Sequence, residues 1–329
     1  MTLLVTGGCG FIGTHFVRKW LRTNDELLVN VDKLSYSSNL HTAELISPNY
    51  KFIKLDICQT EKLREVIYQF RPRAIVHIAA ETHVDESILH PARFISSNIN
   101  GTASILEVSR VYLDRLSRDE KMKFRLINVS TDEVYGSLSE NVSPFDEESP
   151  LNPSSPYSAS KAAADLLALS YFKTYDFPVI ISRCSNNYGS WQHAEKLIPK
   201  VVKALCNRTE IPIYGEGRQI REWIYVEDHV DALLAILSKG NPGSIFNIGS
   251  GYELENLNLV SMILAIAGPL VGDHQNRLSS LIRMVDDRPA HDFRYALDSS
   301  RIRKELGWSP KWSFADGLNE TVTALISEI

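Results

Sequence analysis

Cysteine is scarce in this chain of 329 residues, and its spacing excludes two common uses of it. The four cysteines, Cys9, Cys58, Cys184 and Cys206, lie far apart in the sequence and form no C-x-x-C pair. Neither a zinc site nor a disulfide framework is therefore indicated. We expect no metal site, and thiols that stay reduced, as they do in the cytoplasm.

Long hydrophobic runs and an excess of basic charge are also missing. No apolar run approaches the ~20 residues that a membrane-spanning helix needs, so we expect no membrane partner. The net charge is -5, and no basic cluster indicates a nucleic-acid partner. The opening MTLLVTGG enters a strand pattern at once and lacks the charged start of a signal peptide. A cytoplasmic location is therefore expected.

The sequence does contain a regular alternation of two patterns. Short apolar runs bounded by turn residues are mostly followed by longer segments with helical periodicity, such as HFVRKWLRT, EKLREVIYQF and ARFISSNINGTASILEVSRVYL. The apolar runs are TLLVTG, ELLVNVD, KFIKLD, AIVHIAA, RLINVS and PVIISRCSN. This alternation predicts an α/β fold with a doubly wound, parallel, Rossmann-type sheet.

The pattern changes after Asn187, where the segments become shorter and more mixed. We expect residues 1–187 to form a cofactor-binding domain, to which later segments return. Residues 188–329 are expected to form mainly a smaller, mixed α/β substrate-binding lobe. No low-complexity linker separates the two parts, which favours two lobes that share one cleft.

A glycine-rich turn follows the first predicted strand. Gly7, Gly10 and Gly13 stand at the start of a helix, where glycine lets the backbone approach a pyrophosphate and the helix N-terminus favours its charge. Asp32 closes the second strand about 20 residues later, where an acid binds the ribose of an adenosine. Its carboxylate favours NAD over NADP, whereas Lys33 beside it suits a 2′-phosphate.

A tyrosine and a lysine share one face of a predicted helix. Tyr157 and Lys161 stand four residues apart in SSPYSASK, at the start of that helix. A phenol of pKa ~10 is a poor base, but an adjacent ammonium favours its ionised form. With NAD, and with Ser130 or Thr131 nearby, this pair can remove a proton from an alcohol while hydride leaves its carbon.

Two carboxylates follow the fifth strand, in the stretch VSTDEVYG. Oxidation of an alcohol does not need them, but elimination of water from the adjacent carbons needs one base and one acid. Asp132 and Glu133 supply both. Because successive side chains on a strand point to opposite faces, the chain must leave the extended conformation at or just after Thr131 for both to act on one ring.

Longer stretches carry a family resemblance. The glycine turn, the six strands and the Tyr-Lys pair resemble the extended short-chain dehydrogenase/reductase superfamily over nearly the whole chain. Within it, STDEVYG, ETHVDESI, SSPYSASKAAAD, RCSNNYG, EKLIPKVV, PIYGEGRQIREWIYVEDH, NIGSG and DRPAHDFRYALD resemble the family of dTDP-glucose 4,6-dehydratases.

The resemblance implies a reaction in three steps. These are oxidation at C4 of the hexose with Tyr157 as base, loss of water between C5 and C6 with Glu133 as base and Asp132 as acid, and return of hydride to C6. Tightly bound NAD would be regenerated in each turnover.

The resemblance also implies binding residues, position by position. Cofactor contacts are expected from Gly7, Gly10, Phe11, Ile12, Gly13, Asp32, Lys33, Leu34, Ser35, Asp56, Ile57, Ala79, Ala80, Ser97, Tyr157, Lys161 and Asn187. Sugar-nucleotide contacts are expected from Thr82, Thr131, Asn186, Lys196, Leu197, Pro212, Ile213, Tyr214, Arg221, Asn256, Arg288 and His291. The guanidinium forks of the two arginines suit the pyrophosphate of such a substrate.

Several alternatives remain open at this level. Ser190-Trp-Gln-His-Ala stands where the family has something nearer PYHFP, and Ala290 stands where it usually has glycine, so UDP-glucose remains an alternative substrate. A nucleotide-sugar 4-epimerase would share NAD, Tyr157 and Lys161, and a non-catalytic NAD sensor would share the fold. The helices around residues 98–113 and 157–172 resemble those that pair subunits in this superfamily, which implies a homodimer.

Overall fold

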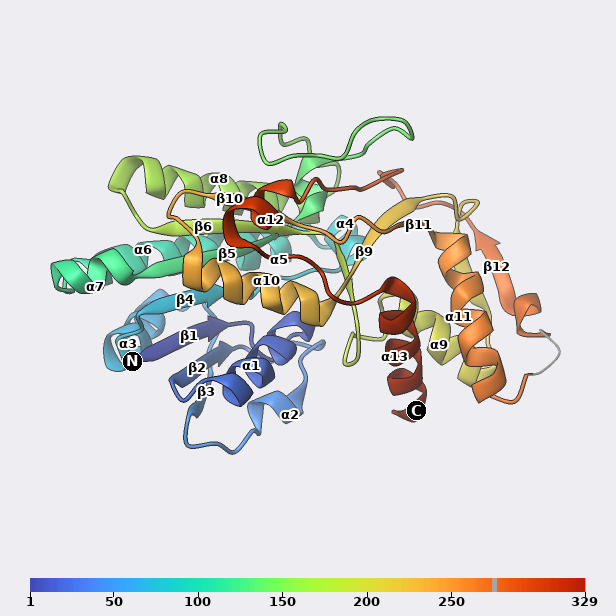
Figure 1. Ribbon diagram of the computed structural model, residues 1–329, viewed down its shortest axis with the longest axis horizontal. Coiled ribbons are helices and arrows are strands. Elements are labelled where there is room, and N and C mark those ends of the chain that lie inside the picture. Colours follow the sequence, from blue (N-terminus) through green and yellow to red (C-terminus); the bar gives the residue numbers. More distant parts are fainter. Residues whose placement is uncertain (274–276, 329) are drawn as a thin grey trace.

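A seven-stranded parallel sheet forms the centre of the molecule (Figure 1). The computed structural model describes residues 1–273 and 277–328. The strand order is β10-β6-β5-β4-β1-β2-β3, and every ladder in this sheet is parallel. The strands are β1 Thr2–Thr6, β2 Leu27–Asp32, β3 Tyr50–Lys54, β4 Ala74–His77, β5 Arg125–Thr131, β6 Val179–Cys184 and β10 Ile245–Ile248. The prediction of a doubly wound parallel sheet is therefore confirmed.

Both faces of the sheet are covered, which explains why its strands are almost continuously apolar. All five residues of β1 and all six of β6 are buried. Alternate strand residues pack into two separate core clusters, because successive side chains point to opposite faces. The helices α1 Phe11–Thr23, α10 Val226–Lys239 and α12 Ser300–Leu306 cover one face. The other face is covered by α3 Thr60–Phe70, α6 Gly101–Leu113 and α8 Pro156–Tyr175.

The long helix predicted over residues 92–113 consists of three consecutive segments in the structure. Its first part is α5 Pro91–Phe94, a π-helical turn follows at Ile95–Asn100, and α6 completes it. Such π-turns often occur at functional sites. Here the turn carries Ser97 to the wall of a large cavity. The remaining short helices of this part are α2 Leu40–Ala43, α4 Val84–Leu89, α7 Arg118–Lys123 and a 3₁₀ turn at Asp132–Tyr135.

A smaller lobe packs beside the carboxyl ends of the central strands (Figure 1). It contains a three-stranded sheet of order β11-β9-β7 and a two-stranded pair β12-β8, with a core cluster of its own. Its strands are β7 Asn186–Tyr188, β8 Ile211–Tyr214, β9 Ile220–Tyr225, β11 Glu253–Glu255 and β12 Ile282–Val285. Its helices are α9 Leu197–Asn207, α11 Asn256–Leu270, a 3₁₀ turn at Arg277–Leu281 and α13 Phe314–Ser327.

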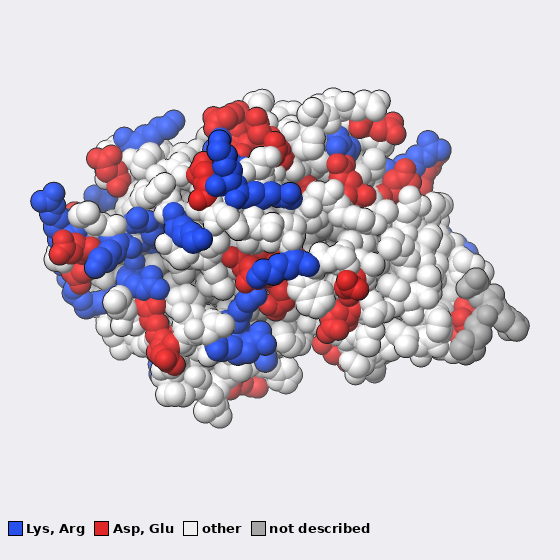
Figure 2. Space-filling view, viewed as in Figure 1, with Lys and Arg blue, Asp and Glu red and all other residues white. Residues whose placement is uncertain are grey.

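The chain crosses between the two parts more than once. β9 runs directly into α10 on the central sheet, and β10 then joins the edge of that sheet beside β6. Acidic and basic side chains are interspersed over the face shown in Figure 2. Within the described ranges, no helix is long and apolar enough to cross a membrane.

Candidate active site

Two cavities meet at the carboxyl edge of the central sheet, where ligands bind in folds of this kind. The first, which we call the cofactor cavity, has a volume of about 270 Å³ and lies against the ends of β1 to β6. The second, the outer cavity, has a volume of about 210 Å³ and lies between α4 and the smaller lobe. The residues that line both, which we call the junction, are Thr82, Glu133, Asn186, Asn187, Gln192, Glu195 and Lys196.

The glycine turn at the end of β1 leaves no room for side chains. Gly7 has a φ of +73°, and a Cβ there would lie 2.5 Å from the backbone nitrogen of Ala79. A Cβ on Gly13 would lie 2.1 Å from the carbonyl oxygen of Gly7. The turn is therefore packed against β4 and opens α1 toward the cavity. This cradle fits the pyrophosphate of a dinucleotide.

Asp32 closes the adenosine side of the cofactor cavity. Its carboxylate accepts hydrogen bonds from the backbone N–H groups of Cys9, at 3.0 Å, and Leu34, at 2.8 Å. Burial raises the pKa of Asp32, and these hydrogen bonds oppose that rise. The ammonium of Lys33 pairs with Glu81 at 2.7 Å, so its charge is compensated within the protein. This arrangement favours NAD over NADP, because the 2′-phosphate of NADP would need the positive charge of Lys33, which Glu81 already compensates.

The structure brings almost the whole predicted cofactor set together. Every predicted cofactor contact lines the cofactor cavity apart from Leu34, which contributes its backbone N–H to Asp32 instead. The sequence analysis missed Ser37, Ser38, Gln192 and Glu195 on this wall. The two serines extend the turn after β2, and no local pattern distinguishes them from ordinary turn residues.

Helix α8 places Tyr157 in its first turn. The side chain of Ser155 caps the helix by accepting a hydrogen bond from the backbone N–H of Ser158 at 3.1 Å, and Pro156 follows as the first helical residue. The ring of Phe94 packs edge-on against the Tyr157 ring at 6.4 Å. Tyr157 is buried and lines the cofactor cavity.

Lys161 forms a buried hydrogen bond with the central sheet, a contact that the sequence did not predict. Its ammonium donates a hydrogen bond to the carbonyl oxygen of Val129 in β5 at 2.7 Å. Burial raises the pKa of Tyr157 well above its usual range, the Glu133 carboxylate adds to that rise, and a hydrogen bond with Thr131 opposes it. The expectation that Lys161 favours the ionised form of Tyr157 stays a prediction. The structure shows Lys161 joining α8 to β5.

The chain leaves the extended conformation directly after Thr131, as the two-carboxylate mechanism requires. Strand β5 ends there, and Asp132–Tyr135 form a 3₁₀ turn. The Thr131 hydroxyl accepts a hydrogen bond from the backbone N–H of Glu133 at 3.3 Å. Gly136 ends the turn with a φ of +84°, and a Cβ there would lie 2.2 Å from the carbonyl oxygen of Asn152. This geometric prediction is confirmed.

The surroundings of Asp132 favour its protonated form. Burial raises its pKa well above the usual range, and the nearby carboxylates of Glu133 and Glu222 raise it further. One carboxylate oxygen accepts a hydrogen bond from the Thr131 hydroxyl at 3.1 Å. The other is buried and has no hydrogen-bond partner among the described residues. A protonated carboxyl with an unpaired oxygen at a cavity wall can act as a general acid.

The positive charges around Glu133 counteract the effect of its burial. Burial raises its pKa, and the positive charges of Arg288, Arg221 and Lys196 oppose that rise without cancelling it. Glu133 lines both cavities, whereas Asp132 lines only the cofactor cavity. Two adjacent carboxyl groups in unlike environments divide naturally into an acid and a base.

Cationic side chains converge on the outer cavity. The guanidinium of Arg221 is held by the carbonyl oxygens of Ile220, at 2.8 Å, and Asp292, at 2.9 Å. Lys196 donates to the carbonyl oxygen of Thr82 at 2.9 Å. Arg288 completes the set, so this cavity can hold a diphosphate.

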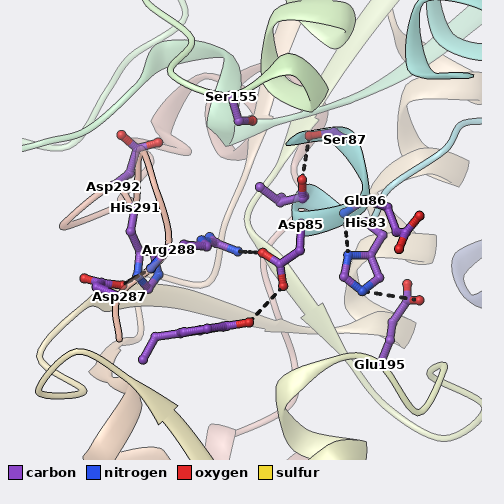
Figure 3. A network of polar contacts seen from close by, with 12 residues as sticks. His83, Asp85, Glu86, Ser87, Ser155, Glu195, Asp287, Arg288, His291 and Asp292 are labelled. Atoms are coloured by element: carbon purple, nitrogen blue, oxygen red, sulfur yellow. Dashed lines mark hydrogen bonds and ion pairs between the residues drawn. The ribbon is translucent and has the colours of Figure 1, made fainter. Parts of the chain in front are cut away.

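A polar network joins the two lobes across this cavity (Figure 3). Asp85 of α4 pairs with Arg288 at 3.3 Å and accepts a hydrogen bond from the Tyr214 hydroxyl at 3.1 Å. Beside it, His291 pairs with Asp287. Asp85 belongs to a stretch that carried the resemblance, but its residue type alone indicated no role.

The predicted substrate contacts are also brought together. All of them line the outer cavity apart from Thr131, which lines the cofactor cavity. Sequence reasoning missed several residues of this wall, which are His83, Asp85, Gln192, Glu195, Trp223 and Tyr295. Ala290, one of the departures from the family pattern, has a left-handed φ of 54°. That conformation favours glycine and costs alanine about 1 kcal/mol.

In the part of the chain that the structure describes, no group of three or more His, Cys, Asp or Glu side chains is arranged to hold a metal ion.

Comparison with known proteins points to one group of enzymes. The family described as GDP-mannose 4,6 dehydratase matches residues 4–321. The dTDP-glucose 4,6-dehydratase of Haemophilus influenzae is 44% identical over 327 residues, which cover 98% of this chain and 97% of that protein. A dTDP-glucose 4,6-dehydratase of Escherichia coli is 44% identical over 335 residues, which cover 98% of this chain and 92% of that protein.

Solved structures agree in fold. DesIV, a dTDP-glucose 4,6-dehydratase from Streptomyces venezuelae solved with NAD bound, has a TM-score of 0.90 at 40% identity and covers 100% of this chain and 97% of its own. A UDP-glucose 4-epimerase from Thermotoga maritima has a TM-score of 0.87 at 28% identity, and the match covers 100% of this chain and 99% of that protein. The two folds are almost equally similar, so the residues of the site must separate the two activities.

Proposed function

The chain belongs to the GDP-mannose 4,6-dehydratase family, and we infer that it is an NAD-dependent dTDP-glucose 4,6-dehydratase. The observation that carries this conclusion is the turn at Asp132–Tyr135, which follows β5 and presents two adjacent carboxyl groups to the cavities. A 4-epimerase needs only the oxidation and has no evident use for both. The substrate dTDP-glucose is taken from the curated relatives, and we propose that the product is dTDP-4-keto-6-deoxyglucose.

The first step uses the groups around Tyr157. NAD, when bound, accepts a hydride and later returns it. We propose that Tyr157 removes the proton of the C4 hydroxyl as hydride leaves C4, with the Thr131 hydroxyl beside the phenol. Lys161 holds α8 against β5 through Val129 and supplies a positive charge near the phenol. The result is a ketone at C4, which makes the proton on C5 acidic.

The second step uses the two carboxyl groups. Glu133 takes the proton from C5, and Asp132 gives a proton to the hydroxyl that leaves C6, so one molecule of water is lost. This assignment follows the electrostatics, because cations oppose the rise in the pKa of Glu133 whereas carboxylates add to the rise in that of Asp132. Hydride then returns to C6 and a proton to C5. The enzyme ends the cycle in its starting redox state.

The outer cavity supplies the binding energy. We propose that Arg221, Arg288 and Lys196 hold the diphosphate, which places the hexose at the junction beside Glu133. Accordingly, residues 1–187 would bind mainly the cofactor and residues 188–329 mainly the sugar nucleotide, with later segments such as β10 returning to the first part.

Two further properties are part of the proposal. We propose a homodimer formed through the helices around residues 98–113 and 157–172, where Leu166 of α8 is 57% exposed. Apolar side chains of this size favour a protein partner at such a face. We also propose a cytoplasmic location, in which the four free cysteines would stay reduced.

Product analysis tests the function. The protein should convert dTDP-glucose to a keto product lighter by one water, and should convert UDP-glucose more slowly when the two are compared side by side. The Tyr157→Phe variant is the control, and in a single turnover it should form no NADH transient. A product of unchanged mass with the galactose configuration would show that the protein is an epimerase instead.

A further inference from the structure

The loop of residues 189–196, which we call the junction loop, connects β7 to α9 and is fixed on its outer side. Trp191 has a left-handed φ of 61°, and its ring lies 4.9 Å from that of His15 in α1. The guanidinium carbon of Arg18 stands 4.6 Å over the same ring. His15 also donates a hydrogen bond to the carbonyl oxygen of Ser190 at 3.0 Å. These contacts hold the start of the loop against the larger part of the molecule.

The other end of the junction loop is fixed as well. The ring of His193 packs edge-on against Tyr36 at 5.3 Å. The carboxylate of Glu195 pairs with His193 at 3.4 Å and with His83 at 3.7 Å, the latter contact being visible in Figure 3. Gln192 lies between these two anchored ends. Its backbone position is therefore set by contacts that do not involve its own side chain.

The amide group of Gln192 forms a hydrogen bond through its nitrogen and none through its oxygen among the described residues. Its Nε2 donates a hydrogen bond to the carbonyl oxygen of Asn187 at 2.8 Å. Because a carbonyl oxygen can only accept, this contact fixes the orientation of the amide. Its Oε1 is buried and has no hydrogen-bond partner in the described part of the chain. A buried amide oxygen without a partner costs free energy, and a ligand donor can recover it.

The place of Gln192 limits what that donor can be. Gln192 lines both cavities. In the proposed reaction the hexose must span this junction, because Tyr157 reacts with it in the cofactor cavity and its diphosphate lies in the outer cavity. The hydroxyl groups on C2 and C3 take no part in the reaction and need partners. A neutral acceptor serves them without adding another charge beside Glu133.

We propose that Gln192 is a substrate-binding residue whose Oε1 accepts a hydrogen bond from a non-reacting hydroxyl of the hexose. This inference rests on the proposed function and adds a determinant of sugar recognition to it. The cations of the outer cavity recognise the diphosphate of any sugar nucleotide. Gln192 would recognise the hexose itself.

Binding measurements on the NAD-loaded protein test this role. Titration calorimetry with dTDP and with dTDP-glucose gives the contribution of the hexose as a ratio of two affinities. In the Gln192→Leu variant the affinity for dTDP-glucose should fall about fivefold, as expected for one neutral hydrogen bond, and that for dTDP should not change. The 2-deoxy or the 3-deoxy sugar nucleotide should bind wild type and variant equally, which identifies the hydroxyl.

The control variant is Trp191→Phe, which alters the anchor of the junction loop at a residue that lines neither cavity. It should leave the ratio of the two affinities unchanged. An equal loss for dTDP and dTDP-glucose in Gln192→Leu would overturn the proposal, because it would show an effect through the loop. If Gln192→Leu lost affinity for NAD alone, Gln192 would be a cofactor contact, and the proposal would also be overturned. If wild-type protein neither binds nor converts dTDP-glucose, the proposed function itself fails.

Discussion

At the scale of single residues, Asp132 and Glu133 are adjacent in the chain, but their electrostatic surroundings differ. Glu133 faces Arg288, Arg221 and Lys196, whereas the charges that act most on Asp132 are carboxylates. The sequence could predict that the two acids follow a strand and require a bend. Apart from the family resemblance, nothing in the sequence indicated which of them is the acid, because the three cations come from segments more than 60 residues further along the chain.

Glu133→Gln should separate oxidation from elimination. The variant should still form an NADH transient, because Tyr157 is retained as the base, but should not exchange deuterium from solvent into C5. Product formation should fall roughly 10² to 10⁴-fold, the usual contribution of a general base. Absorbance in a single turnover and mass spectrometry of the recovered sugar measure the two steps.

Asp132→Asn is the matched variant for this experiment. It should retain exchange at C5 and lose elimination from C6. Exchange that persists in Glu133→Gln and disappears in Asp132→Asn would reverse the two roles. In the wild-type protein, elimination should weaken as the pH rises through the raised pKa of Asp132, because only its protonated form donates.

At the scale of elements, helix α8 is tied to the central sheet by buried polar contacts. Asp165 accepts a hydrogen bond from Asn128 of β5 at 3.0 Å and pairs with Arg183 of β6 at 2.9 Å. Arg183 in turn donates a hydrogen bond at 2.8 Å to Tyr135 in the 3₁₀ turn Asp132–Tyr135, which we call the carboxylate turn. One turn before Asp165, burial lowers the pKa of Lys161 and Asp165 raises it. The helix, two strands and the carboxylate turn thus form one unit.

Removing one partner of the buried pair should cost more stability than removing both. Asp165→Asn leaves Arg183 as an uncompensated buried charge, which should cost about 3–5 kcal/mol of unfolding free energy. Replacing both, as Asp165→Leu with Arg183→Met, should cost less than the single change, because no charge then remains unpaired. Urea unfolding followed by fluorescence measures both values. Equal or additive losses would contradict this account.

The elements differ in how far the sequence predicts them. Six strands of the larger part were predictable because each is a short apolar run between turn residues, and all but the edge strand β3 are almost wholly buried, as in LLVNVD and VIISRC. The start of α8 was predictable from its serine and proline. The π-turn at Ile95–Asn100 was not, because it has no periodicity of its own. The contact of Lys161 with Val129 depends on packing between elements, and spacing along the helix suggested a different partner.

At the scale of the whole molecule, one neutral histidine connects three elements of the larger part. His77 in β4 accepts a hydrogen bond at Nδ1 from the Thr6 hydroxyl of β1, at 2.7 Å. Its Nε2 donates to the Thr102 hydroxyl of α6 at 3.0 Å, and that hydroxyl donates to the carbonyl oxygen of Asn98. Burial, and then the charge of Lys161, lowers the pKa of His77 to about 3.

His77 should make the fold sensitive to acid. Its pKa is lower in the folded than in the unfolded chain, so its stabilising contribution is complete above pH ~6.5 and declines as the pH falls toward 3. His77→Gln should be less stable than wild type at pH 8, and the difference should shrink by about 2 kcal/mol at pH 5. Denaturant midpoints at the two pH values test this. A constant difference would mean that His77 is protonated in the folded protein.

The strand order of the central sheet has a consequence for the synthesis of the protein. β10, at Ile245–Ile248, is the neighbour that β6 needs, yet it follows the first strands and helix of the smaller lobe in the sequence. A nascent chain that has emerged only as far as Tyr188 therefore exposes β6 as a bare apolar edge, which is prone to pair with other chains. The ribosome must add some 60 further residues before that edge is covered. During this interval the growing protein is exposed to aggregation, so slow translation of this segment should increase its loss.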